Sequence, residues 1–295
     1  MPSLADHQSN TLAKVLLIGD SKSGKTGSLI ELVKAGFKLR IIDTDNLLDV
    51  LRQYILRECP DKINNVEYRT IRDERKAGAL GPVIAGKPKA FMTAIKMIDE
   101  WKYTDEATGN VIDYGRPDEW GPDCILVIDS LSRLCDAAYD HYEPLVPRGS
   151  KGDFDARAVY GNAQDGIESL LAHLTSESFR TNVIIIAHVA YQEMPDKSVK
   201  GFPQGVGQKL SPKIPQYFSS VILYTNKNGK RSIRTNSTPL IDLANPMPFE
   251  ISPDLPYPEG IATIFNTLRG AAKPTPAATP PKRPQAVQLR RATPA

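Results

Sequence analysis

The sequence predicts an α/β fold in which a mainly parallel central sheet is flanked by helices and followed by a C-terminal β-hairpin. Three observations support this fold class. Short, largely apolar runs recur at residues 15–18, 39–42, 124–128 and 183–187, and each ends at a glycine or a polar residue. Apolar residues at helical spacing lie between these runs. A glycine-rich loop follows the first run, so that strand, loop, helix and strand form a βαβ unit.

This first unit occupies residues 14–46. The run 15–18 is too short for a helix and is closed by Gly19, so we expect a buried strand. Apolar residues then recur at helical spacing as far as Phe37, and Gly36 stands where a helix C-cap would lie. A second strand follows and ends in Asp43.

The loop between the first strand and its helix predicts a nucleoside triphosphate site. It consists of Gly19, Asp20, Ser21, Lys22, Ser23, Gly24, Lys25 and Thr26, which fit G-x-x-x-x-G-K-[ST] at every defined position. Its backbone N–H groups would surround an anion, and the helix N-terminus adds about half a positive charge. Lys25 is expected on the β- and γ-phosphates, and the Thr26 hydroxyl on Mg²⁺. The alternative is a glycine-rich turn with a chance lysine.

The composition suits a soluble globular protein: of 295 residues, 41% are hydrophobic and 24% are charged. No apolar run reaches the roughly 18 residues that span a membrane, so no membrane contact is expected. The N-terminal segment lacks the apolar stretch of a secretory signal. Three cysteines, Cys59, Cys124 and Cys135, have no C-x-x-C spacing and are expected to be reduced, as in a cytoplasmic protein.

The positive charge is unevenly distributed. The chain has a net charge of +3, and residues 271–295 hold five basic residues and no acidic one, which leaves −2 for the rest. We therefore expect three parts: a mobile lead at 1–13, one ATPase domain at 14–269 and a disordered, basic, Pro/Ala-rich tail at 270–295.

The run 124–128 ends in Asp129 and predicts a central parallel strand with a carboxylate at its C-terminal end. In proteins with this glycine-rich loop, a carboxylate at that place holds Mg²⁺. The alternative is that Asp129 caps the helix that begins near Leu131.

The remaining elements follow from hydrophobic period and turn residues. We expect helices at 46–57, 89–101, 156–179 and 259–268, strands at 66–71 and 182–188, and hairpins at 101–120 and 221–235. Residues 190–215 are expected to form a long loop with the composition of a single-strand binder, because lysines neutralise phosphates and aromatic rings stack on bases. Its candidate residues are Tyr191, Lys197, Lys200, Phe202, Lys209 and Lys213. The alternative is an ordinary solvated loop.

Three segments in this order resemble the ATPase core of the RecA recombinases. They are residues 42–49, residues 128–130 and the strand that ends in His188. At this size, the sequence is most similar to the short RecA-like ATPases of bacteriophages, which are linked to single-strand annealing and DNA recombination. The resemblance covers about residues 14–242 and implies a RecA-like P-loop NTPase fold, with ATP and Mg²⁺ as ligands and the cytoplasm of a bacterial host as location.

The resemblance also implies roles for two residues. Asp45 falls where the family has the glutamate that activates the attacking water, although Asp is one methylene shorter. The alternative is an N-cap for the helix expected from Asn46. His188 stands where the family has a glutamine that senses the γ-phosphate and passes its state to the DNA loop. The alternative is a hydrogen-bonded histidine at a strand end.

The same resemblance suggests partners. Lys230, Arg231 and Arg234 lie on the second hairpin and are candidates for fingers that reach the γ-phosphate of a neighbouring subunit. The expected partners are single-stranded DNA, further copies in a ring or filament, and a single-strand-binding or host replication protein. We expect an ATP-dependent protein that promotes annealing or strand exchange. The alternatives are an ATP-gated DNA-binding or assembly module with little hydrolysis, and a helicase or loader on the same fold.

Overall fold

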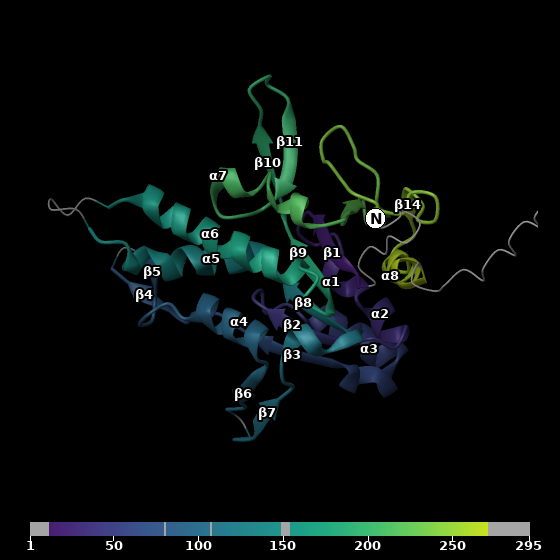
Figure 1. Cartoon of the computed structure of the whole chain (residues 1–295), viewed down its shortest axis with the longest axis horizontal. Coiled ribbons are helices and arrows are strands. Elements are labelled where there is room, and N and C mark those ends of the chain that lie inside the picture. The colour runs from purple at the N-terminus through teal and green to yellow at the C-terminus, as the bar shows by residue number, and fades with distance from the viewer. Residues whose placement is uncertain (1–11, 80, 107, 149–153, 271–295) are drawn as a thin grey trace, which may run out of the picture.

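The computed structural model describes residues 12–79, 81–106, 108–148 and 154–270, and its centre is an eight-stranded sheet between two layers of helices (Figure 1). The strand order is β14-β13-β12-β1-β9-β8-β2-β3. From β12 to β3 all neighbours are parallel, and β13 and β14 are antiparallel additions at one edge. The strands are β1 (Lys14–Gly19), β2 (Lys38–Asp43), β3 (Val66–Thr70), β8 (Gly121–Asp129), β9 (Thr181–Ala187), β12 (Ser220–Lys227), β13 (Lys230–Arg234) and β14 (Asp254–Leu255). The predicted α/β fold with a mainly parallel sheet is confirmed.

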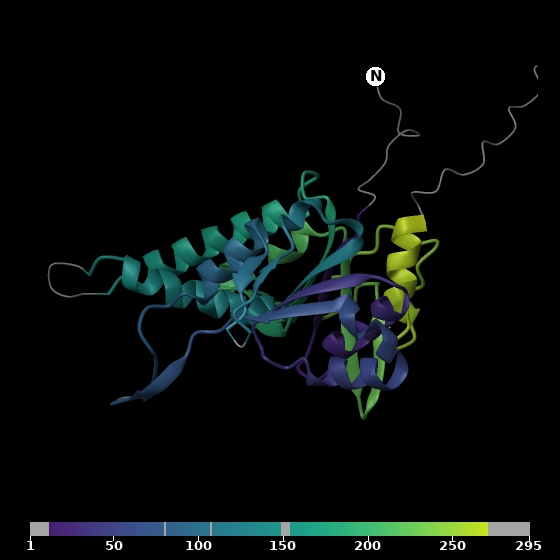
Figure 2. The same ribbon diagram turned by 90° about the horizontal axis from the view of Figure 1, so that it is seen from below.

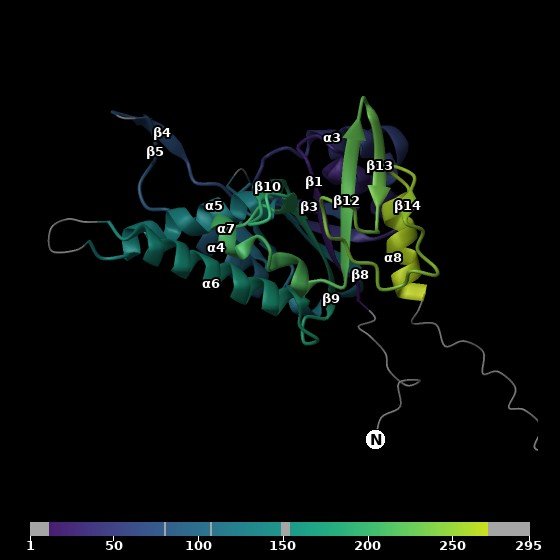
Figure 3. The ribbon, with the colours of Figure 1, turned by 90° about the horizontal axis from the view of Figure 1, so that it is seen from above.

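The helices cover both faces because the strand residues alternate between two cores. Leu16 and Ile18 of β1 belong to one core, with α4 (Ala90–Asp99), α5 (Leu131–Tyr142) and α6 (Ala156–Thr175). Val15 and Leu17 belong to the other core, with α2 (Ile30–Lys34), α3 (Asp49–Glu58) and α8 (Gly260–Gly270). Figure 3 shows α8 beside β12 and β13, at the opposite end from the tips of α5 and α6. Strands buried on both faces explain the continuous apolar runs in the sequence.

The order of the strands brings the predicted site residues together. Strand β9 lies between β1 and β8, although it follows both in the chain. Ile18 pairs with Ala187, and Asp129 lies level with Ile186 and with Asp43. The glycine-rich loop, Asp129 and the residue after β9 therefore emerge at the same carboxyl edge of the sheet.

Several predicted elements are confirmed and three need correction. The hairpins at 101–120 and 221–235 are present as β6–β7 (Lys102–Thr104 and Val111–Asp113) and β12–β13, and the latter extends the central sheet. The expected long loop at 190–215 is instead a hairpin, β10 (Val189–Glu193) with β11 (Val199–Pro203), followed by the short helix α7 (Gly207–Leu210). The helix after the glycine-rich loop is divided into α1 (Lys25–Ser28) and α2.

The helix expected from Asn46 begins later than predicted. Asp43 Oδ1 accepts hydrogen bonds from the backbone N–H groups of Asp45 (3.2 Å) and Asn46 (2.7 Å), and Asn46 has a φ of 57°. This turn delays the start of α3 to Asp49, so Asp45 does not cap it. The alternative reading of Asp45 as an N-cap is therefore wrong.

The chain ends lie mostly outside the described residues. This applies to the predicted mobile lead, except for its last two residues, and to the predicted tail beyond Gly270. Within the lead, Ala13 is buried and its N–H donates to Asn182 Oδ1 at 2.9 Å, so it joins the sheet. Among the described helices, none has the length and apolar character needed to cross a membrane.

Removing the Phe265 ring tests the core beneath α8. This side chain is fully buried and packs edge-on against Phe37, with 5.8 Å between ring centroids. We expect Phe265→Ala to lower the free energy of unfolding by about 3–5 kcal/mol, because a buried aromatic ring is lost and a cavity remains. Phe249→Ala is the control, since Phe249 is 99% exposed, and should change it by less than about 0.5 kcal/mol. Urea unfolding followed by circular dichroism would measure both, and equal losses would contradict the packing described.

Candidate nucleotide-binding site

The glycine-rich loop depends on two positions that only glycine fits. Gly24 has a φ of 102°, and a Cβ there would lie 2.7 Å from the ring of Tyr257. Gly19 has a φ of 152°, and a Cβ there would overlap the carbonyl oxygen of Tyr224. The Tyr257 hydroxyl also donates to the Gly24 carbonyl at 3.2 Å. The loop therefore turns tightly between β1 and α1 and leaves its other face open to the pocket.

Lys25 lies folded against this loop. Its Nζ donates to the carbonyl oxygens of Gly19 (2.7 Å) and Asp20 (3.0 Å). Burial lowers the pKa of Lys25 to about 8, although the carboxylates of Asp129, Asp20 and Asp45 act in the opposite direction. A buried ammonium group whose hydrogen bonds go only to uncharged oxygens, here the two carbonyls and the Ser23 hydroxyl (3.4 Å), has a strong electrostatic preference for an anionic ligand such as a phosphate.

Thr26 and Asp129 form a pair of oxygen ligands. The Thr26 hydroxyl donates to Asp129 Oδ2 at 2.6 Å. Burial raises the pKa of Asp129 to about 7, and the hydrogen bond from Thr26 opposes that shift. Helix α5 is capped instead by Ser130, whose hydroxyl accepts from the Arg133 N–H at 3.4 Å, so the alternative role of Asp129 as its cap is wrong. A hydroxyl beside a carboxylate suits Mg²⁺, which takes few protein oxygens and completes its shell with phosphate and water.

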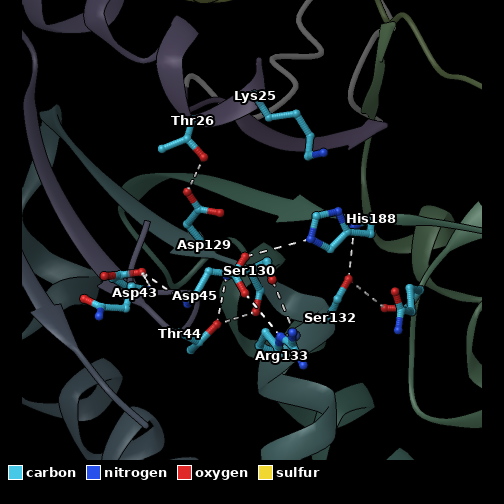
Figure 4. A network of polar contacts seen from close by, with 12 residues as sticks. Lys25, Thr26, Asp43, Thr44, Asp45, Asp129, Ser130, Ser132, Arg133 and His188 are labelled. Atoms are coloured by element: carbon cyan, nitrogen blue, oxygen red, sulfur yellow. Dashed lines mark hydrogen bonds and ion pairs between the residues drawn. The ribbon is translucent and has the colours of Figure 1, made fainter. Parts of the chain in front are cut away.

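Asp45, His188 and Arg133 meet beside this pair (Figure 4). Asp45 Oδ2 lies 3.9 Å from His188 Nε2, and Asp45 Oδ1 lies 3.5 Å from Arg133 Nε. Burial, followed by the charge of Lys25, lowers the pKa of His188, so its imidazole is neutral near pH 7. A neutral imidazole can donate one hydrogen bond and accept another.

These groups line one pocket of about 500 Å³. The predicted residues of the nucleotide site that line this pocket with a charged or hydroxyl side chain all lie at the carboxyl edge of the sheet. They are Ser21, Lys22, Lys25, Thr26, Asp45, Asp129 and His188. The pocket also contains residues that sequence reasoning did not identify, among them Tyr257, Ser132 and Gln204. No spacing rule could have found Tyr257, which bonds to a loop 233 positions away in the chain.

The three predicted finger residues lie in different surroundings. Arg231 lines the pocket of its own chain, with its guanidinium 5.2 Å from the centre of the Tyr257 ring. Arg234 Nε lies 2.9 Å from Asp254 Oδ1. Lys230 is exposed at the turn of the β12–β13 hairpin.

The predicted DNA-binding residues are not gathered on one face. Tyr191 is 52% exposed on β10, and its pKa is raised by burial and by the nearby carboxylate of Asp20 in the glycine-rich loop. Lys200 and Lys213 are paired with Asp242 (3.0 Å) and Glu168 (2.7 Å). The other three are the exposed Lys197 between the hairpin strands, the half-buried Phe202 of β11 and the exposed Lys209 of α7.

A short polar network joins the pocket to the base of the β10–β11 hairpin. The Ser132 hydroxyl, in the first turn of α5, accepts from the His188 N–H at 3.0 Å and donates to the Gln204 carbonyl at 3.4 Å. The Gln204 N–H donates to the His188 carbonyl at 2.8 Å. His188 is also the single residue between β9 and β10. Both ends of the hairpin are therefore fixed to residues of the pocket.

The buried carboxyl of Asp129 makes stability depend on pH. Because its pKa is higher in the folded state than the ordinary value of 3.8, the folded protein binds more protons, and this contribution to stability is lost as pH rises towards about 7. We expect Asp129→Asn to raise the free energy of unfolding at pH 8 by an amount on the order of 1 kcal/mol or more, and to change it little at pH 4. Urea unfolding without Mg²⁺ or nucleotide at both pH values would measure this, and a variant destabilised equally at both would contradict it.

Comparison with known proteins places this site in a family. A family model described as an AAA domain matches residues 11–245. A search of curated proteins gives no match. Among solved structures, an ATPase from the type III secretion system of pathogenic bacteria aligns at 13% identity and a TM-score of 0.37, over 72% of this chain and 51% of its own, so this chain spans about half its length. Because the family match covers most of the chain and includes the glycine-rich loop, the chain belongs to the AAA domain family and has the α/β fold of a P-loop NTPase.

Proposed function

We propose that this chain is an Mg²⁺-dependent ATPase that binds single-stranded DNA and promotes annealing or strand exchange in phage recombination. The observation that carries the proposal is the polar network from the nucleotide pocket, through Ser132, to the base of the β10–β11 hairpin. This contact gives the nucleotide a route to a projecting element (Figure 1). The resemblance of residues 42–49 and 128–130 to the RecA recombinases supplies the DNA and recombination part.

The chain's own groups account for nucleotide binding. Lys25 would exchange its bonds to loop carbonyls for bonds to the β- and γ-phosphate oxygens, and the loop N–H groups would bind the remaining oxygens. Thr26 and Asp129 would hold Mg²⁺, which neutralises the charge that develops on the phosphate oxygens when it is bound. Ionised Asp129 is required for this, so Mg²⁺ affinity should increase as pH rises through about 7.

Asp45 is the group that would position the attacking water and accept its proton. It lies in the same pocket, where its Oδ1 is 3.5 Å from Arg133 Nε, and a carboxylate is the kind of group that a base requires. The neutral His188 beside it would donate a hydrogen bond to a γ-phosphate oxygen. Loss of that phosphate would release His188 and, through its backbone, the base of the hairpin.

A second function, ATP-gated binding with little hydrolysis, is favoured by the surroundings of Asp45. Its carboxylate already faces Arg133 and His188, and it is one methylene shorter than the glutamate at the matching place in the recombinases. A base withdrawn by about 1 Å can cost roughly 100-fold in rate. In that case ATP would act as a structural ligand that orders the hairpin.

Substitutions of Asp45 separate these two functions. We expect Asp45→Asn to lower phosphate release at least about 100-fold while nucleotide affinity changes little, because the base is removed and the phosphate ligands remain. Asp136→Asn is the control, since Asp136 lines the same pocket without a proposed role, and should change the rate by less than about threefold. A large rate increase for Asp45→Glu would instead favour the ATP-gated module. Hydrolysis unaffected by Asp45→Asn would refute its role as base.

ATP should strengthen DNA binding. We expect about a tenfold higher affinity for a labelled oligonucleotide with ATP than without it, equivalent to about 1.4 kcal/mol of coupling, and no such gain in Lys25→Ala. Fluorescence anisotropy would measure both affinities. Lys38→Ala is the control and should keep the gain, because Lys38 is exposed at the amino end of β2, away from the pocket at the carboxyl ends of the strands. Equal affinity with and without ATP in the wild-type protein would rule out the switch.

A further inference from the structure

A strongly basic segment leaves the same edge of the sheet as the nucleotide pocket. Residues 69–89 contain six basic and two acidic side chains. Apart from this segment and residues 271–295, which hold five basic and no acidic residues, the chain has 26 basic and 32 acidic residues. The rest of the chain is therefore acidic. A local excess of positive charge is typical of a surface that binds a polyanion.

Most of this segment forms a projecting hairpin, which we name the basic arm (residues 72–89). Its strands β4 (Arg75–Gly78) and β5 (Gly81–Ile84) pair with each other and, among the described residues, with no other strand, and every residue of β4 is exposed. Figures 2 and 3 show the basic arm extending away from the sheet, beside the ends of α5 and α6. A hairpin of this kind gains little from burial, which indicates a role outside the fold itself.

The root of the basic arm is fixed to the body at two points. Asp73 Oδ1 accepts from the backbone N–H groups of Lys89 (2.8 Å) and Ala90 (3.1 Å), which ties the root to α4. Arg75 Nη2 donates to Asp140 Oδ2 of α5 at 3.1 Å. Asp73, one of the two acidic residues of the segment, therefore binds the N–H groups at the start of α4. Its carboxylate forms no ion pair with a cation of the basic arm in the described structure.

Four cations of the basic arm remain unpaired. The side chains of Arg72, Lys76, Lys87 and Lys89 are exposed and make no ion pair or hydrogen bond within the described part of the chain. The β10–β11 hairpin differs from the basic arm in its net charge, although its Lys197 is likewise exposed and makes no ion pair within the described residues. Residues 189–203 hold two basic and two acidic residues and are neutral overall, and Lys200 is paired.

Three cations also converge on a pocket at the root. Arg69, Arg72 and Lys89 line a cavity of about 560 Å³. The polar part of the lining also includes Thr70, Thr93 and two acidic residues, Asp105 and Glu106. Arg69 lies 3.9 Å from Glu106, which is a long ion pair with a largely exposed partner. Both hydroxyls already donate within the protein, Thr70 to Asp43 Oδ2 (3.0 Å) and Thr93 to the Lys89 carbonyl (2.8 Å), so a phosphate group in this pocket would be held by the cations.

We propose that the basic arm and the pocket at its root bind the sugar–phosphate backbone of single-stranded DNA. This inference rests on the proposed function and assigns its electrostatic contact to a different element from the β10–β11 hairpin. The basic arm contains no aromatic residue, so it contacts phosphates and leaves base stacking to side chains such as Tyr191. Cations spread along an extended hairpin match an extended polyanion better than the compact surface of an acidic protein.

The salt dependence of DNA binding tests this assignment. We expect Arg72→Gln/Lys76→Gln/Lys87→Gln to bind a fluorescent oligothymidylate at least tenfold more weakly at low salt. The slope of log affinity against log salt should become shallower by about 2, since each phosphate contact to single strands contributes about 0.7. ATP hydrolysis without DNA should be unchanged, because none of the three residues lines the nucleotide pocket.

Two further variants control for charge and folding. Arg72→Lys/Lys76→Arg/Lys87→Arg keeps the charges and should bind as the wild-type protein does. Lys38→Gln/Lys96→Gln/Arg180→Gln removes the same net charge from exposed positions away from the basic arm and should leave the slope within about 0.5 of the wild type.

The outcomes distinguish the two proposals. A wild-type slope in the neutralised variant, or an equal loss in the control triple, would overturn the role of the basic arm and leave the proposed function intact. A wild-type protein that does not bind single-stranded DNA at any salt concentration would overturn both.

Discussion

The central strands are buried on both faces, and this constraint decides where the chain can hold charge. Strands β1 and β9 offer no exposed side, so polar side chains with access to a ligand can stand only at their ends. At the carboxyl edge, Lys25 and Asp129 are both buried, and burial shifts their pKa values in opposite directions. Each is tolerated because it is hydrogen-bonded, Lys25 to loop carbonyls and Asp129 to Thr26. The pocket therefore holds a cationic group, Lys25, for an anion and a carboxyl group, Asp129, for the cation that accompanies it.

The base of the β10–β11 hairpin lies at the same edge of the sheet. Strand β9 ends at Ala187 and β10 begins at Val189, so one residue separates the rigid sheet from the hairpin. Ser132 bonds to both sides of the hairpin base, and its helix begins at Leu131, two residues after Asp129. His188 and Ser132 line the nucleotide pocket and also hold the base of the hairpin, so no long chain of contacts separates the pocket from the hairpin.

Charge and aromatic groups are divided between two elements. The β10–β11 hairpin is neutral and exposes Tyr191, whereas the basic arm is cationic and has no aromatic residue. A ligand that contacts both would have its backbone bound by one element and its bases by the other. This division explains why composition alone drew attention to residues 190–215: that segment combines lysines with aromatics, but in the fold Lys200 and Lys213 pair with Asp242 and Glu168.

The sequence by itself determined the local features. The glycine-rich loop with Thr26, the apolar strands and the position of Asp129 at a strand end follow from residue type and short-range spacing, which require no knowledge of distant contacts. Only the tertiary structure decided what depends on strand order and on polar contacts between distant residues. Insertion of β9 between β1 and β8 placed His188 beside Asp45, and the turn around Asp43 freed Asp45 from capping α3. Tyr257 and Ser132 joined the pocket for the same reason: their partners are remote in the chain, and no periodic pattern records such contacts.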